Sequence, residues 1–127
     1  MSKQPITTTS APAAVGPYSQ GIAANGFLYI SGQLPVDMKT GEMVTEIKSA
    51  VTACLENVEA IAKAGGVSKG DMVKMTMFLA DMNNFAQANE AYSAFFEGTV
   101  PPARSAFQVA RLPKDAIVEI EAVAALK

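Results

Sequence analysis

Hydrophobic positions change their spacing along the chain, and each change predicts a different kind of element. In the first third, short apolar runs alternate with turns, and the runs at 22–24 and 27–30 flank the pair Asn25-Gly26. Both turn residues tolerate a positive φ, so this pattern predicts a β-hairpin. An extended segment over residues 3–7 is expected before it, followed by a loop over residues 10–18.

From residue 46 onward the apolar period lengthens to about 3.6 residues, which is the period of an α-helix. The pair Gly65-Gly66 then supplies a C-cap and a turn. We therefore expect an amphipathic helix that ends there. Its apolar side consists of Ile47, Val51, Cys54, Leu55, Val58, Ile61 and Ala62.

The remainder of the chain predicts three more strands and a second helix. Residues 71–79 alternate in polarity like a strand, and residues 84–96 follow as a helix that Pro101-Pro102 prevents from continuing. Residues 104–110 and 117–124 alternate again, and we expect two final strands there. The element order indicates an α+β domain with two helices, spanning residues 1–127.

Two helices cover only one face of such a sheet, so we expect a second copy of the chain to bury the other face. In the last two strands, alternation favours a helix-facing set and an opposite set. The helix-facing set is Ser105, Phe107, Val109, Val118, Ile120 and Ala122. The opposite set is Arg104, Ala106, Gln108, Glu119, Glu121 and Val123.

Composition narrows the available chemistry. The 127 residues contain no histidine and one cysteine, Cys54, which excludes a Ser-His-Asp triad, a disulfide framework and a Cys/His zinc site. Acid/base work near neutral pH therefore falls to a carboxylate, a Lys, a Tyr or bound water. No Asp/Glu group has metal-ligand spacing, and we expect neither a metal nor a cofactor. Cys54 itself reads as a buried small hydrophobe.

Charge argues against extended anionic partners. Ten Lys and Arg against twelve Asp and Glu give a net charge of -2, and the basic residues are scattered, which disfavours nucleic acid. The N-terminus has no apolar signal-peptide core, and the uncharged stretch 4–36 is broken by Pro and Gly. We expect no membrane association and a cytoplasmic location, which suits an unpaired cysteine.

Arg104 and Glu119 are the most informative candidate pair. The pattern places them on neighbouring strands and on one face, where the Arg fork can bind a substrate carboxylate and the Glu can orient or deprotonate water. The alternative is a structural ion pair at a subunit interface. Glu121 is a competing carboxylate on the same face.

Two turn-rich segments offer further candidates. Tyr18, after Gly16-Pro17, forms either a pocket wall or the cover of a core edge. Ser31-Gly32, directly after an apolar strand, either offers a hydroxyl and an accessible N–H to a ligand or simply ends the strand. The stretch 65–70 lacks the spacing of a phosphate loop and reads as a turn.

Three segments carry a family resemblance. They are SAPAAVGPYSQ at 10–20, ISGQLP at 30–35, and PARSAFQVARLPKD at 102–115, which continues into VEIEA at 118–122. In this order they closely resemble the RidA (YjgF) family of reactive-intermediate deaminases, and the resemblance extends over nearly the whole chain.

The resemblance implies a chorismate-mutase-like α+β fold with a mixed sheet, assembled as a homotrimeric barrel with clefts between subunits. It implies hydrolysis of 2-imino acids, released by pyridoxal-phosphate dehydratases acting on Thr or Ser, to 2-oxo acids and ammonia. The matching positions imply that Arg104 holds the substrate carboxylate and Glu119 handles the attacking water. Tyr18, Ser31 and Asn89 are implied to help form the pocket.

The chain departs from the family pattern in two places. Ala106 stands where many members have Cys, so a thiol is not required, although the backbone carbonyl there can still contact water or imine. The connection 96–101 is short, which leaves the outer pocket wall open to question. A non-catalytic binding or regulatory protein for 2-oxo or amino acids is the main alternative. Ribonuclease activity, attributed to some relatives, is disfavoured by the absent histidine and the acidic composition.

Overall fold

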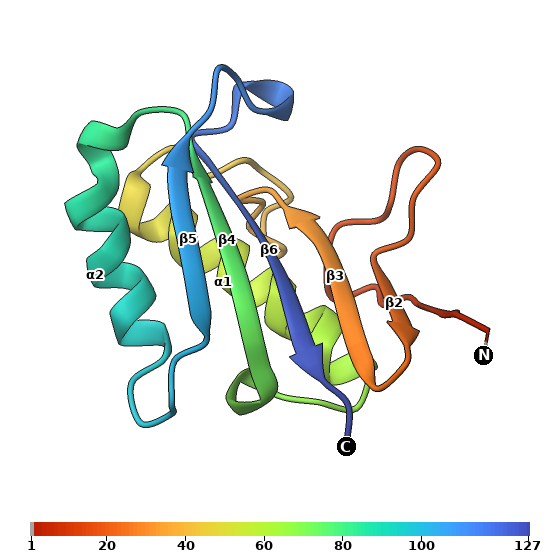
Figure 1. The fold of residues 1–127 in the computed structure, drawn as a ribbon. Coiled ribbons are helices and arrows are strands. Elements are labelled where there is room, and N and C mark those ends of the chain that lie inside the picture. The colour runs from red at the N-terminus through yellow and green to blue at the C-terminus, as the bar shows by residue number, and fades with distance from the viewer. Residues whose placement is uncertain (1) are drawn as a thin grey trace.

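A six-stranded sheet in the order β1-β2-β3-β6-β4-β5 carries two α-helices on one face in the computed structural model, which describes residues 2–127 (Figure 1). Neighbouring strands are antiparallel except β4 and β5, which are parallel. The strands are β1 Gln4–Ile6, β2 Gly21–Ala24, β3 Phe27–Gln33, β4 Met72–Leu79, β5 Ala103–Gln108 and β6 Val118–Ala125. The helices are α1 Ile47–Ala64 and α2 Phe85–Phe95, with short 3-10 turns at Lys69–Asp71, Met82–Asn84 and Pro113–Asp115.

The predicted hairpin is confirmed. Ala24 pairs with Phe27 across a two-residue loop, and Asn25 and Gly26 have φ values of 51° and 85°. Positive φ at both positions gives the turn a twist that matches the flanking strands. The local sequence is therefore sufficient to set this register.

Helix α1 begins after Glu46, whose carboxylate accepts hydrogen bonds from the backbone N–H groups of Lys48 and Ser49 at 2.9 and 3.0 Å. These bonds lower the pKa of Glu46 because they favour its charged form, and the bond from Lys48 has the larger effect. Gly65 provides the predicted C-cap. The cap residue Glu46 thus satisfies two N–H groups that the first turn leaves without partners.

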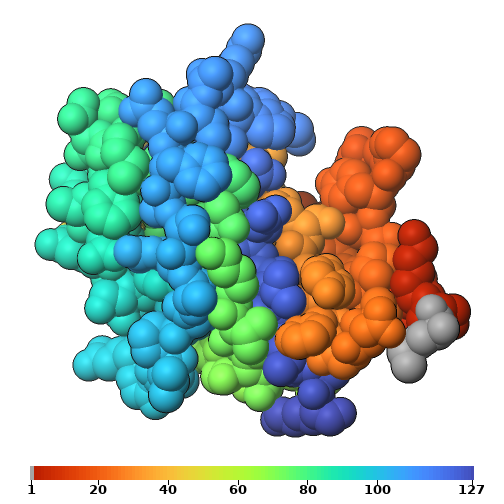
Figure 2. All heavy atoms as spheres, in the orientation of Figure 1, coloured from red at the N-terminus to blue at the C-terminus, as the bar shows by residue number. Residues whose placement is uncertain are grey.

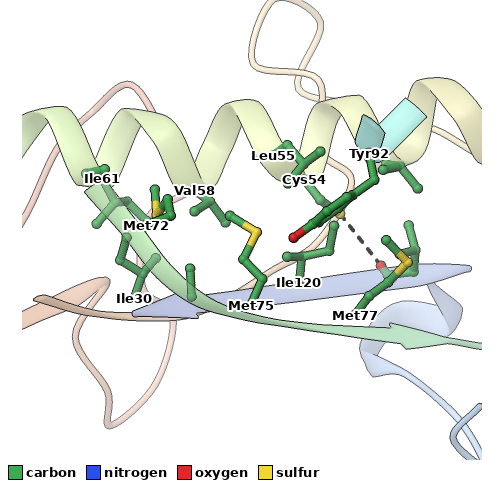
Figure 3. Close-up of a cluster of buried hydrophobic side chains, with 14 of the residues drawn as sticks. Ile30, Cys54, Leu55, Val58, Ile61, Met72, Met75, Met77, Tyr92 and Ile120 are labelled. Carbon is green, nitrogen blue, oxygen red and sulfur yellow. Dashed lines mark hydrogen bonds between the residues drawn. The ribbon is translucent and has the colours of Figure 1, made fainter. Parts of the chain in front are cut away.

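The core lies between α1 and the sheet (Figure 3). Leu55, Val58 and Ile61 of α1 pack over Met75 of β4 and Ile120 of β6, and all five are fully buried. Complete removal of such side chains from water is the largest favourable contribution to folding.

Cys54 is part of this core, as predicted. It is fully buried, and its thiol lies 3.8 Å from the carbonyl of Val118 (Figure 3). Burial raises the pKa of the thiol well above its usual value. Cys54 is therefore an inert packing residue in this fold.

The opposite face of the sheet has no helix over it. Figure 1 views this face directly, and Figure 2 shows its side chains uncovered in the same orientation. Phe27 and Tyr29 of β3 and Phe107 of β5 are between 40% and 48% exposed. We refer to this surface as the open face.

The face predictions hold for β6 and fail for β5. Val118, Ile120 and Ala122 of β6 are buried beneath the helices. On β5, however, Arg104 pairs with the buried Met75 and lies beneath α2.

The prediction that Ser105 and Phe107 face the helices is therefore wrong. Phe107 lies on the open face, where its ring meets that of Phe78 edge to face at 5.3 Å. Val109 lies beyond the end of β5. The parallel register with β4 sets the orientation of β5, and aromatic rings on α2 accommodate Arg104 on the helix side where alternation alone favours a hydrophobe.

Candidate functional site

Arg104 is held by one face of α2. Its Nη1 donates a hydrogen bond to Oδ1 of Asn89 at 2.7 Å, and its guanidinium lies 4.7 Å from the ring centre of Tyr92 and 5.4 Å from that of Phe85. Cation–π contacts and the charge-assisted bond restrict the side chain to one orientation. The bond uses one of five N–H donors, which leaves a fork for a carboxylate.

Around Arg104 lies a depression of 950 Å³. One side is formed by Asn89, Tyr92 and Phe96, and the other by the connection from Glu97 to Pro102. The connection that looks short in the sequence therefore does provide a wall. Ala106 lies on the same side of β5 as Arg104, partly buried against the core.

Glu119 lies in a second depression, of 660 Å³, on the open side of the sheet. Tyr18, Ser31, Gly32 and Glu121 also line it. Partial burial raises the pKa of Glu119 the most, and the negative charge of the neighbouring Glu121 raises it further. A carboxyl with a raised pKa exchanges its proton more readily near neutral pH, as a general acid or base requires.

The two N-terminal motifs are joined at this depression. The Ser31 hydroxyl donates to the carbonyl of Ser19 at 2.6 Å, and the Ser31 N–H donates to that of Gln20 at 2.9 Å. The buried Gln20 side chain in turn donates to the carbonyl of Pro12 at 2.8 Å. These bonds hold the loop that carries Tyr18.

The structure shows where the two candidate segments of this region lie. Tyr18 is 52% exposed and lines the depression, so it does not cover a core edge. Strand β3 continues through Gln33, so Ser31-Gly32 does not end it.

The predicted adjacency of Arg104 and Glu119 is wrong. Strand β4 lies between β5 and β6, and the two residues pair with β4 residues of opposite faces, Met75 for Arg104 and Phe78 for Glu119. Within one chain, one of them therefore points beneath α2 and the other into the open face. No ion pair joins them in residues 2–127.

The sequence did not reveal that the rings of Phe85 and Tyr92 pack against the Arg104 guanidinium. Phe85, Asn89 and Tyr92 are spaced i, i+4 and i+7 on α2, and this spacing places them on one helical face. This spacing is visible in the sequence. It identifies these three side chains as the contacts of Arg104 only once β5 is known to run beneath α2. Lys114, at φ 56°, also lines the Glu119 depression and was not singled out.

One depression contains an oriented guanidinium with free N–H donors, and the other contains a partly buried carboxyl with a raised pKa. Among residues 2–127, no three Asp, Glu, Cys or His side chains are grouped as metal ligands. No helix in that range is both long and apolar enough to span a membrane.

Comparison with known proteins identifies the family. The family described as endoribonuclease L-PSP matches residues 8–126. A RutC family protein of Pyrococcus horikoshii is 51% identical over 123 residues, 96% of this chain and 97% of that one. The 2-iminobutanoate/2-iminopropanoate deaminase of Salmonella typhimurium is 49% identical over 121 residues, 94% of each chain. The chain belongs to this family, which is the RidA (YjgF) family of the sequence resemblance.

Solved structures agree in fold. TdcF of E. coli with bound serine has a TM-score of 0.94 at 46% identity, covering 98% of this chain and 99% of that one. The YjgF gene product of E. coli gives the same TM-score, identity and coverage. The predicted single-sheet α+β fold with two helices is therefore confirmed.

Proposed function

We propose that this protein hydrolyses 2-imino acids to 2-oxo acids and ammonia. The observation that carries the proposal is the partly buried Glu119 carboxyl, whose pKa is raised by burial and by Glu121, in a depression on the open face. Its relatives at 48–49% identity are named 2-iminobutanoate/2-iminopropanoate deaminases. An imine is already electrophilic, so a positioned water and one proton-transfer group are sufficient.

In the proposed reaction, Arg104 binds the substrate carboxylate in two parallel hydrogen bonds. Glu119 takes a proton from water as the water oxygen attacks the imine carbon, and the C=N bond becomes a C–N bond. Glu119 then returns the proton to nitrogen. In the collapse, Glu119 takes the hydroxyl proton of the carbinolamine as the C=O bond forms and delivers it to the nitrogen as the C–N bond breaks, so that ammonia leaves with the electron pair of that bond and the 2-oxo acid remains.

We propose further that each site is shared between two copies of the chain in a homotrimer. Arg104 and Glu119 face opposite sides of one sheet, so a second copy is needed to complete the pair. The exposed Phe27, Tyr29 and Phe107 on the open face supply an apolar surface for that contact. The family resemblance supports the trimer.

The deaminase proposal is tested with an amino-acid oxidase that generates the imine, which semicarbazide traps. We expect Arg104→Ala and Glu119→Ala each to reduce imine hydrolysis by about tenfold or more, since general acid–base and orientation effects have at least that size. Arg111→Ala and Glu42→Ala, both at exposed positions, are the matched controls. Full activity in both site variants would overturn the assignment.

A non-catalytic binder of small amino or 2-oxo acids is the second candidate. The TdcF structure with bound serine favours it, because a relative there holds an amino acid. The presence of Glu119 argues for hydrolysis, since binding a carboxylate needs only Arg104. In the same assay, a binder leaves the rate of imine disappearance unchanged.

The family's description as an endoribonuclease names a third activity. The chain has no histidine and a net charge of -2, both unfavourable for RNA cleavage and phosphate binding. We expect no cleavage of RNA by highly purified protein. Cleavage that Arg104→Ala abolishes would contradict this expectation.

A further inference from the structure

A β-bulge in β3 lies against the Glu119 side chain. Ile30 pairs with Ala122 and Gln33 pairs with Ile120, so three steps along β3 face two steps along β6. The extra residue falls at Ser31-Gly32. Bulges of this kind change the direction in which the strand presents its residues.

Gly32 leaves the space that Glu119 occupies. A Cβ built at position 32 would lie 2.5 Å from Oε2, 2.8 Å from Cδ and 3.2 Å from Cγ of Glu119. Real Cβ atoms do not approach other heavy atoms closer than about 3 Å, so the carboxylate lies directly across the Gly32 backbone.

Backbone conformation does not explain the glycine. Gly32 is not among the residues with positive φ, which are Asn25, Lys114, Asp115 and the glycines 16, 26, 41, 66 and 98. An L-residue can adopt the backbone geometry found at position 32. The space required by Glu119 is therefore the reason for glycine here.

The bulge is fixed from both sides. Ser31 donates from its hydroxyl and its N–H to the carbonyls of Ser19 and Gln20, and the buried Gln33 amide donates to the Ser31 carbonyl at 3.1 Å. A side chain added at Gly32 would therefore displace the Glu119 carboxylate, because these hydrogen bonds hold the backbone of the bulge in place.

We propose that Gly32 is a positioning residue. Because it has no side chain, it leaves the space in which the Glu119 carboxylate lies when it activates water. The catalytic part of this inference rests on the proposed imine hydrolysis. Arg104 of the same chain lies on the other face of the sheet, and the three atoms nearest to the added Cβ all belong to Glu119. Gly32→Ala should therefore lower kcat by about tenfold or more and change KM by less than about twofold.

The first experiment follows Glu119 directly by 13C NMR titration of the labelled carboxyl, with Glu119→Gln to assign the signal. In the wild-type protein we expect a Glu119 pKa raised above the ordinary value of a Glu side chain. In Gly32→Ala we expect it to fall toward that value as the carboxyl leaves its partly buried position. Gly70→Ala is the matched control, since a Cβ there meets only Ser68 Oγ at 3.9 Å. An unchanged Glu119 pKa in Gly32→Ala overturns the proposal.

The second experiment combines Gly32→Ala with Glu119→Ala, which removes all three clashing atoms. If Gly32→Ala alone does not fold, the double variant should fold with the urea midpoint of Glu119→Ala. Failure of both variants overturns the proposal. The pKa titration and the urea midpoints use no imine. They therefore test whether Gly32 positions Glu119 even where the protein has no deaminase activity. In an active wild-type enzyme, an unchanged kcat in Gly32→Ala overturns the catalytic part.

Discussion

The Arg104 and Glu119 depressions lie on opposite faces of one sheet and hold their charged side chains by different interactions. Arg104 is a long, flexible cation, and it is immobilised beneath α2 by one amide oxygen and two aromatic rings. Glu119 has a shorter side chain and lies over the glycine of a bulge, partly removed from water, where burial raises its pKa. One depression holds a cation in a fixed orientation, and the other holds a carboxyl whose pKa is raised.

Separation by the sheet keeps the two charges from neutralising each other. An Arg beside Glu119 in the same chain would favour the charged carboxylate and lower its pKa. The guanidinium donors would then also be occupied by a protein carboxylate instead of a substrate. Within one chain the two groups are therefore not paired with each other, and in the proposed shared site a second copy of the chain would bring them together.

The largest effect is expected when two inactive variants are mixed. Arg104→Ala and Glu119→Ala chains, co-refolded in equal amounts, should regain about a quarter of the wild-type sites, because random assembly pairs an intact Arg104 with an intact Glu119 at that frequency. Activity that stays at the level of the separate variants would contradict the shared site. Mixing either variant with itself is the control.

Asn89 tests the orientation of Arg104. Asn89→Ala removes the hydrogen bond to Nη1, and a charge-assisted bond of this kind contributes about 1.5 kcal/mol, so KM for the imine should rise about tenfold with little change in kcat. Asn83→Ala, at an exposed position outside the depression, should leave KM unchanged. A changed kcat at constant KM would instead link Asn89 to the chemical step.

Tyr92 separates packing from polarity in the same depression. Its hydroxyl is buried and finds no hydrogen-bond partner among residues 2–127, and burial raises the pKa of Tyr92 to about 12. Figure 3 shows the side chain reaching into the core cluster. Tyr92→Phe should raise the free energy of unfolding by about 1 kcal/mol and leave KM unchanged, because the ring beneath Arg104 stays. A lower urea midpoint would show that the hydroxyl is satisfied in solution.

Glu119 gives the smallest effect, and its sign depends on pH. Because its pKa is higher in the folded than in the unfolded chain, the wild-type protein loses stability as pH rises through the folded-state value. Glu119→Gln cannot ionise and lacks this loss. We expect its urea midpoint to exceed that of the wild type at about pH 7.5 and to match it below about pH 4. The reverse order at pH 7.5 would show a lowered pKa.

Much of the local structure is predictable because it depends on near neighbours in the sequence. The pair Asn25-Gly26 gives the hairpin its turn, and the apolar period that includes Cys54 gives α1 its buried face. The candidate residues Tyr18, Ser31, Gly32 and Glu119 were also identified, and the structure brings these four together. Alternation within β6 predicted correctly which of its side chains lie beneath the helices.

The sequence by itself determined the types of element, the α+β class, the family motifs and the two candidate residues Arg104 and Glu119. Only the tertiary structure decided that β4 lies between β5 and β6, and that Arg104 points beneath α2 while Glu119 faces the open side. Alternation fixes which residues of a strand share a face, but not which face that is. The face follows from the register with the neighbouring strand and from what the distant helix α2 offers: an Asn and two rings that make the buried side favourable for an arginine.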